Sequence, residues 1–165
     1  MEYSKAFRER LREEIIADEG CVLEVYKDHL GYYTVGVGHL ILPSDEEWKT
    51  PTGTKITQTR ADELLVKDFN NVLKECEDGL TVWSEVGEEV KLILANMAFN
   101  LGLPRLKKFQ LMLKALSEKD YVKASEEGLD SLWAKQTHNR AKRLMGRLRD
   151  VDVTDKFDSE GRLKK

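Results

Sequence analysis

The sequence predicts an α+β fold that is mostly helical, and three observations support this prediction. Apolar residues recur at helical spacing in most of the chain, which indicates amphipathic helices. Residues 32–39 instead alternate in character from one position to the next, as a strand does. The chain of 165 residues is long enough for one well-filled core but not for two ordinary domains. We therefore expect a single domain, residues 1–165, with a small β lobe and a larger helical lobe.

A first helix is predicted over residues 4–19. Its apolar residues recur every three or four positions, at Phe7, Leu11, Ile15 and Ile16. Ser4 is a suitable N-cap, and Gly20 is a suitable residue to end the helix. Glu19 therefore falls in the last helical turn.

A β hairpin is predicted next, with strands at 22–27 and 32–39 and a turn at 28–31. In the second strand, Thr34, Gly36 and Gly38 share one face. Interior glycines indicate either close approach of a ligand or a bend of the chain, and the pattern leaves both open.

The rest of the chain is predicted to be a loop followed by helices. Prolines interrupt residues 41–56, and Thr57 can then cap a long helix that Gly79 ends. Residues 88–101 are apolar almost all round, which is typical of a buried helix. Shorter helices are predicted at 105–117, 120–130 and 138–149. The polar tail at 150–165 is not assigned a structure.

This order of elements predicts a cleft. The small β lobe is expected at about 21–60, the connecting helix at about 57–78, and the helical lobe at about 79–149 together with helix 4–19. Clefts of this kind commonly bind ligands, so the active site is expected between the lobes.

Composition narrows the class of protein. No apolar run is long enough to cross a bilayer, and residues 1–10 lack the apolar core of a secretory signal, so we expect a protein made in the cytoplasm that does not insert into membranes. Cys21 and Cys76 are expected to be reduced, partly buried thiols. The three histidines are scattered, and neither a metal nor another cofactor is expected.

Charge is unevenly distributed along the chain. Residues 1–100 carry 11 basic and 20 acidic side chains, whereas residues 101–149 carry 12 basic and 5 acidic ones. A basic segment of this kind indicates an anionic polymer as partner. Nucleic acid and bacterial cell wall both fit, and charge does not separate them.

Three residues could carry out glycoside hydrolysis, which requires a protonated carboxyl group and a second group that places or activates water. Glu19 lies at the negative end of its predicted helix, which disfavours its ionised form and suits a proton donor. Asp28, on a polar turn, can stay ionised, and Thr34 offers a hydroxyl group that can hold a water molecule. The spacing of these common residue types is by itself a weak signal.

Longer motifs are more specific. The stretches Asp18-Glu19-Gly20, Tyr26-Lys27-Asp28 and Gly31–Leu40 resemble the active-site segment of the T-even phage lysozymes, glycoside hydrolase family 24. The likeness continues in residues 96–102 and 133–143 and spans about residues 11–149. A lysozyme-like fold is therefore implied.

The resemblance implies cleavage of the β-1,4 bond between N-acetylmuramic acid and N-acetylglucosamine in peptidoglycan glycan strands. Glu19 would donate the proton, and Asp28 and Thr34 would position the attacking water, with inversion at the anomeric carbon. The implied protein is a monomeric phage endolysin that waits in the host cytoplasm and reaches the periplasm and cell wall through a holin.

Further site residues follow from the same resemblance, each with an ordinary structural alternative. Phe99 and Asn100 match a pair at the edge of the cleft, although Phe99 also suits a core position. Gly38 and Leu40 match a substrate-contacting strand end, or form a plain turn. Arg140 is expected to be a supporting residue near the acid, and Trp133 a packed aromatic. His39 is expected to be a structural histidine paired with Asp68.

His29 directly follows Asp28 and is predicted to be a supporting residue. Histidine gains charge close to neutral pH, so its protonation would place positive charge beside the carboxylate and affect the acid side of the activity profile. An unchanged profile in His29→Gln would contradict this prediction.

Some positions depart from the family pattern. Leu111, Met112, Glu127 and Leu132 stand where the best-known member has polar or basic residues, which leaves the preference for wall type open. The basic side chains of residues 135–149 either hold the anionic wall or form a solvated helix face.

Four alternatives to an endolysin remain. A virion-associated lysozyme would open the wall during infection, and a transglycosylase would release anhydro sugars with a single glutamate. A catalytically silent wall-binding module would not need the Glu19, Asp28 and Thr34 set. A nucleic-acid-binding domain would use only the basic helix, and no other feature supports it, so no nucleic acid is expected as partner.

Overall fold

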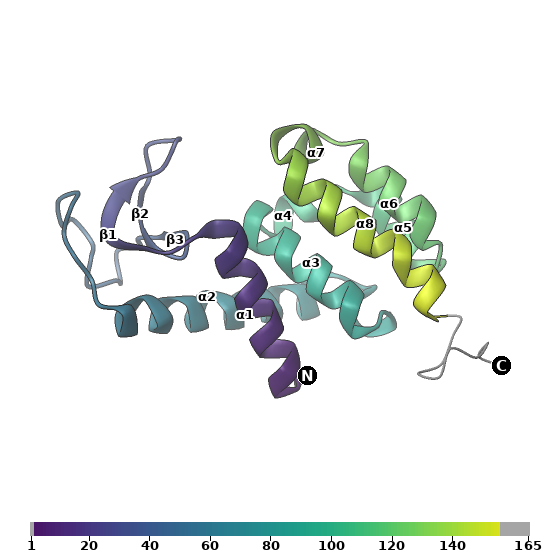
Figure 1. The fold of residues 1–165 in the computed structure, drawn as a ribbon, viewed down its shortest axis with the longest axis horizontal. Coiled ribbons are helices and arrows are strands. Elements are labelled where there is room, and N and C mark those ends of the chain that lie inside the picture. The colour runs from purple at the N-terminus through teal and green to yellow at the C-terminus, as the bar shows by residue number, and fades with distance from the viewer. Residues whose placement is uncertain (1, 156–165) are drawn as a thin grey trace. The chain divides into compact units, whose positions relative to one another are not determined.

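The protein was studied as a computed structural model, which describes residues 2–155. The chain divides into two compact units, one of residues 2–74 and one that begins at Glu75. The fold is mostly helical, with one small antiparallel sheet near the N-terminus, as predicted (Figure 1). How the two units combine around a connecting helix stays a prediction.

The first unit begins with helix α1, Lys5–Glu19, whose limits agree with the prediction. The Ser4 side chain accepts a hydrogen bond from the backbone N–H of Phe7, which satisfies a free N–H group of the first turn. At the other end, Gly20 adopts a φ of 73° and donates its N–H to the carbonyl of Ile16. Glu19 is therefore held at the end of a well-capped helix.

The sheet has three antiparallel strands in sequence order: β1 Val22–Lys27, β2 Tyr33–Gly36 and β3 His39–Leu40. The prediction of one strand over 32–39 was wrong, because the chain turns at Val37 and Gly38. Gly36 and Gly38 have φ values of 65° and 62°, in the left-handed region that favours glycine. The two glycines thus make the predicted bend, and close approach of a ligand stays a prediction.

The sheet has one face in the core of the first unit. Val25, Val35 and Ile41 pack with Leu64 of helix α2, Gln58–Gly79. A Cβ atom on Gly36 would lie 3.5 Å from the Cβ atom of Ala61, so the glycine brings β2 close to this helix.

The opposite face of the sheet follows from the strand register. Tyr26 of β1 pairs with Thr34 of β2, and Thr34 pairs with Leu40 of β3. Paired residues in an antiparallel sheet place their side chains on the same side, and successive residues alternate. Because Val25 and Val35 lie in the core, Tyr26, Thr34 and Leu40 form a row on the other face.

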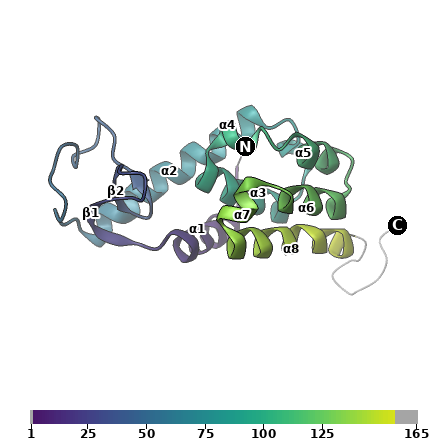
Figure 2. The same cartoon turned by 90° about the horizontal axis from the view of Figure 1, so that it is seen from above.

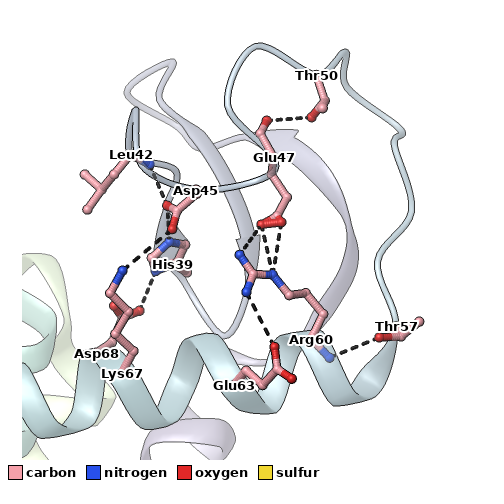
Figure 3. Close-up of polar contacts among 10 residues, drawn as sticks. All are labelled: His39, Leu42, Asp45, Glu47, Thr50, Thr57, Arg60, Glu63, Lys67 and Asp68. Atoms are coloured by element: carbon pink, nitrogen blue, oxygen red, sulfur yellow. Dashed lines mark hydrogen bonds and ion pairs between the residues drawn. The ribbon is translucent and has the colours of Figure 1, made fainter.

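The predicted loop over 41–56 connects β3 to α2, and two polar clusters fasten it to that helix (Figure 3). In the first cluster, the ring of buried His39 contacts Asp45 of the loop at 2.7 Å and Asp68 of α2 at 2.6 Å. In the second, Arg60 donates hydrogen bonds to both carboxylate oxygens of Glu47. The predicted His39–Asp68 pair is confirmed.

The second unit is helical (Figures 1 and 2). Helix α6 packs against both α5 and α8, and α3 contacts α4 and α8. The buried helix predicted over 88–101 is α3, with eight buried residues. After the last turns of α2, the unit consists of one 3-10 helix and six α-helices among the described residues: η1 Trp83–Glu85, α3 Glu88–Leu101, α4 Leu103–Leu106, α5 Gln110–Ser117, α6 Tyr121–Leu129, α7 Leu132–Gln136 and α8 His138–Asp155.

Three boundaries in this unit differ from the prediction. The helix expected over 105–117 is broken before α5, where Phe109 has a non-helical ψ of 57°. Helix α7 was not predicted, although Ser131 caps it by accepting from the N–H of Ala134. Helix α8 continues past Asp150 because Val151 extends the buried stripe of Leu144 and Leu148 by a further turn. The rest of the predicted tail, 156–165, lies outside the described residues.

None of the helices that the structure describes combines the length and the apolar character that a membrane crossing requires.

Candidate active site

Glu19 is the last residue of α1 and is partly buried. Its carboxylate lies beside the turn between β2 and β3, because a Cβ atom on Gly38 would be 3.3 Å from Oε2 of Glu19. The sequence predicted both residues as part of the site, and the structure brings them together.

Asp28 begins the turn after β1, and its side chain organises that turn. Its Oδ1 atom accepts hydrogen bonds from the backbone N–H groups of Leu30 and Tyr32, each at 2.9 Å. Its own backbone N–H donates to the carbonyl of Tyr32, and its carbonyl accepts from Gly31. The carboxylate therefore has a fixed orientation with one oxygen engaged by the protein.

Thr34 lies in β2 with only 5% of its surface exposed. Its hydroxyl group donates a hydrogen bond to the carbonyl of Tyr32 at 2.9 Å. A hydroxyl group has one proton, so Thr34 can interact with a further partner only as an acceptor. Leu40, its neighbour in β3, is 48% exposed on the same face.

Tyr26 adjoins these candidate site residues, and the sequence analysis assigned it no role of its own. Burial raises the pKa of its phenol above the ordinary value of 10.0, and the negative charges of Glu19 and then Asp28 raise it further. Both carboxylates therefore act on one phenol, which is itself paired with Thr34 in the sheet. Apart from the place of Tyr26 in the motif Tyr26-Lys27-Asp28, the sequence carried no signal for this role.

Other predicted site residues lie elsewhere. His29 is exposed in the turn that follows β1. Phe99, Asn100 and Arg140 belong to the second unit, and their relation to Glu19 stays a prediction.

Within the second unit, the contacts of these side chains are defined. Asn100 accepts a hydrogen bond from the indole N–H of Trp133 at 2.8 Å. Trp133 is 3% exposed, which confirms it as a packed aromatic. Arg140 donates to the side-chain oxygen of Asn96 at 2.9 Å, and Phe99 is partly buried at the end of α3.

No group of three or more histidine, cysteine or carboxylate side chains that could hold a metal ion occurs among the described residues. Cys21 and Cys76 are free thiols, the first exposed and the second buried, where burial raises the thiol pKa to about 12. The polar side chains described at the candidate site are two carboxyl groups, a hydroxyl group and a phenol.

Comparison with known proteins supports the resemblance seen in the motifs. The chain is 32% identical over 147 residues to probable T4-type lysozyme 1 of Dictyostelium discoideum, covering 78% of this chain and 86% of that protein. It is 30% identical over 154 residues to probable T4-type lysozyme 2 of the same organism, covering 82% and 91%. It is also 34% identical over 152 residues to the pre-baseplate central spike protein Gp5 of Enterobacteria phage T4, of which it spans only 26%.

The phage lysozyme family model matches residues 17–150, which reach from the end of α1 into α8. The match covers most of the chain, and the two Dictyostelium proteins share similarity over nearly their whole length. The chain therefore belongs to the phage lysozyme family, glycoside hydrolases that act on peptidoglycan.

Proposed function

We propose that this protein hydrolyses the β-1,4 bond between N-acetylmuramic acid and N-acetylglucosamine in peptidoglycan, with inversion at the anomeric carbon. The observation that carries the proposal is the grouping of Glu19, Asp28 and Thr34 around Tyr26 within one unit. Membership of the phage lysozyme family supplies the substrate class.

In this proposal Glu19 is the general acid. It protonates the glycosidic oxygen as the bond to the anomeric carbon breaks, which lets the sugar leave as a neutral alcohol. The cap at Gly20 and the adjacent turn at Gly38 restrict where the Glu19 carboxyl group can move. Such restriction favours one productive orientation of the acid.

Asp28 and Thr34 would hold the attacking water. Oδ1 of Asp28 is occupied by two backbone N–H groups, whereas Oδ2 accepts no hydrogen bond from any residue that the structure describes. Oδ2 is therefore available to accept a proton from water. Thr34 offers a lone pair to the other water proton, because its own proton is donated to Tyr32.

The biological role proposed is that of a monomeric endolysin, which remains in the host cytoplasm until a holin gives it access to the periplasm and wall. The similarity to a phage spike protein favours a second candidate, a lysozyme carried in the virion that opens the wall during infection. Detection of the protein in purified virions by mass spectrometry would favour the second role, and its absence from virions combined with lysis on co-expression with a holin would favour the first.

The reaction can be tested by mass spectrometry of fragments released from purified peptidoglycan. Wild type is expected to release reducing muramic ends, and Glu19→Gln is expected to release none while remaining folded. Glu13→Gln is the matched control, because Glu13 is an exposed carboxyl group on the same helix. Anhydro ends would indicate a transglycosylase, and no cleavage by wild type would indicate a wall-binding module; either result contradicts the proposal.

A further inference from the structure

We propose that the Tyr26 hydroxyl group makes a third contact to the attacking water, as the hydrogen-bond donor that complements the acceptors Asp28 and Thr34. This inference rests on the proposed hydrolytic function and deepens it. It adds one catalytic residue to the three that the motifs indicate.

The strand register places Tyr26 at the correct position. Its Cα partner across the β1–β2 pair is Thr34, so the two side chains lie next to each other on the face opposite the core. Tyr26 is half-buried there, and the charges of Glu19 and Asp28 both act on its phenol. The turn that follows β1 then presents Asp28 two residues further along the chain.

The charge of its neighbours keeps the phenol protonated. Burial, Glu19 and Asp28 all act in the same direction and raise the pKa of Tyr26 above 10.0. A phenol in such surroundings remains a neutral O–H donor throughout the range in which a carboxyl group can act as acid or base.

The phenol proton is also unclaimed by the protein. Among the described residues, the Tyr26 hydroxyl group makes no hydrogen bond, whereas the Thr34 hydroxyl group and Oδ1 of Asp28 are both engaged by backbone groups. A partly buried hydroxyl group without a protein partner is available to a water molecule or ligand.

The hydrogen-bonding capacity of water explains what a donor contributes. A water molecule has two protons and two lone pairs. Oδ2 of Asp28 and the hydroxyl oxygen of Thr34 accept the two protons, Tyr26 donates to one lone pair, and the second lone pair faces the anomeric carbon. During the step a bond forms between water oxygen and that carbon, Asp28 takes a proton, Glu19 protonates the leaving oxygen, and Tyr26 keeps its own proton.

The test is Tyr26→Phe, which removes the hydroxyl oxygen and keeps the ring. On soluble peptidoglycan fragments, kcat is expected to fall about tenfold, the effect of one hydrogen bond made in the transition state, with KM changed by less than about twofold. The melting temperature is expected to stay within about one degree of wild type, because the hydroxyl group has no protein partner to lose. Tyr33→Phe is the control: Tyr33 is the neighbour of Thr34, alternates to the other side of β2 and contacts Lys27 through its ring.

The outcomes separate this inference from the proposed function. Reducing ends from wild type with an unchanged kcat in Tyr26→Phe would overturn the inference alone. A rise in KM at unchanged kcat would instead make Tyr26 a substrate-binding residue, and a melting temperature lowered by several degrees would make it structural; both overturn the inference. Anhydro ends or no cleavage by wild type would overturn the proposed function, and the water contact with it.

Discussion

Gly38 lies against Glu19 so closely that a Cβ atom at this position would be 3.3 Å from Oε2 of the carboxyl group. The same residue has a φ of 62° in the turn between β2 and β3. Two physical constraints therefore act on one position: the backbone conformation and the space beside the proposed acid.

Replacing Gly38 with alanine should affect stability and activity together. The left-handed conformation costs a residue with a side chain about 1–2 kcal/mol, so the free energy of unfolding should fall by about that amount. The new methyl group should also displace the Glu19 carboxyl group and lower kcat by more than about tenfold. Chemical denaturation and peptidoglycan hydrolysis measure the two effects.

Gly53→Ala is the matched control. Gly53 also has a positive φ, 87°, but a Cβ atom there would meet nothing within 4 Å. This variant should lose comparable stability and retain full activity. Equal activity losses in the two variants would show that the contact between Gly38 and Glu19 is unimportant.

A titration can test the arrangement of charges around Tyr26 directly. Negative neighbours disfavour the phenolate and raise the pKa of Tyr26, so their removal in Glu19→Gln or Asp28→Asn should move this pKa downward, toward 10.0. Burial remains in both variants, so part of the elevation should persist. Nuclear magnetic resonance with labelled tyrosine rings can follow this residue among the five tyrosines.

Glu24→Gln is the control for the titration. Glu24 lies on the same strand but does not contribute to the shifted pKa of Tyr26. If Glu24→Gln lowered the pKa of Tyr26 as much as Asp28→Asn does, Asp28 would have no special proximity to the phenol.

His39 should make stability depend on pH. Burial lowers its pKa, but the hydrogen bonds with Asp68 and Asp45 outweigh burial and raise the pKa above 6.5 (Figure 3). A raised pKa means that the folded state binds the proton more tightly. The stabilisation is therefore complete below the unfolded pKa of about 6.5 and is lost as pH rises through the folded pKa.

The comparison that isolates this effect is wild type against His39→Gln, with unfolding measured at a series of pH values between about 5 and 9. The difference in unfolding free energy should be largest at the acid end and shrink as pH rises. The contribution of Asp45 to stability depends on pH in the opposite direction. Burial raises its pKa, but the Leu42 N–H and His39 lower it below 3.8. Its contribution to stability is therefore lost only as pH falls through that lower value.

The sequence predicted those parts of the fold and site that depend on local signals. Helix α1 and its Ser4 cap, the turn at Asp28 and the buried helix α3 each have a signal within a few residues. The strand predicted over 32–39 failed because alternation cannot distinguish an extended glycine from one with positive φ. Tyr26 was missed because its role depends on residues before and after it that only the folded sheet brings together.

The contacts of the 41–56 loop show the same dependence on tertiary structure. The sequence predicts the loop from its prolines, but not that Glu47 within the loop is only 5% exposed. Only the folded chain brings the Glu47 carboxylate onto Arg60, thirteen residues further along.

The last prediction concerns this pair, which fastens the loop to the beginning of α2. Arg60 donates through both Nε and Nη2 to the Glu47 carboxylate, at distances of 2.8–3.2 Å (Figure 3). Arg60→Lys keeps the charge but cannot form this fork, so the free energy of unfolding should fall by about 1–3 kcal/mol. Glu63→Gln is the control, because Glu63 is 62% exposed and its contact with Arg60 is long, at 3.5 Å. The effect of Glu63→Gln on the free energy of unfolding should stay within about 0.5 kcal/mol.

Backbone amides of residues 41–56 should exchange faster with solvent in Arg60→Lys than in Glu63→Gln, since losing the fork frees the loop while α2 stays intact. Equal exchange in the two variants would mean that the fork between Arg60 and Glu47 does not hold the loop in place.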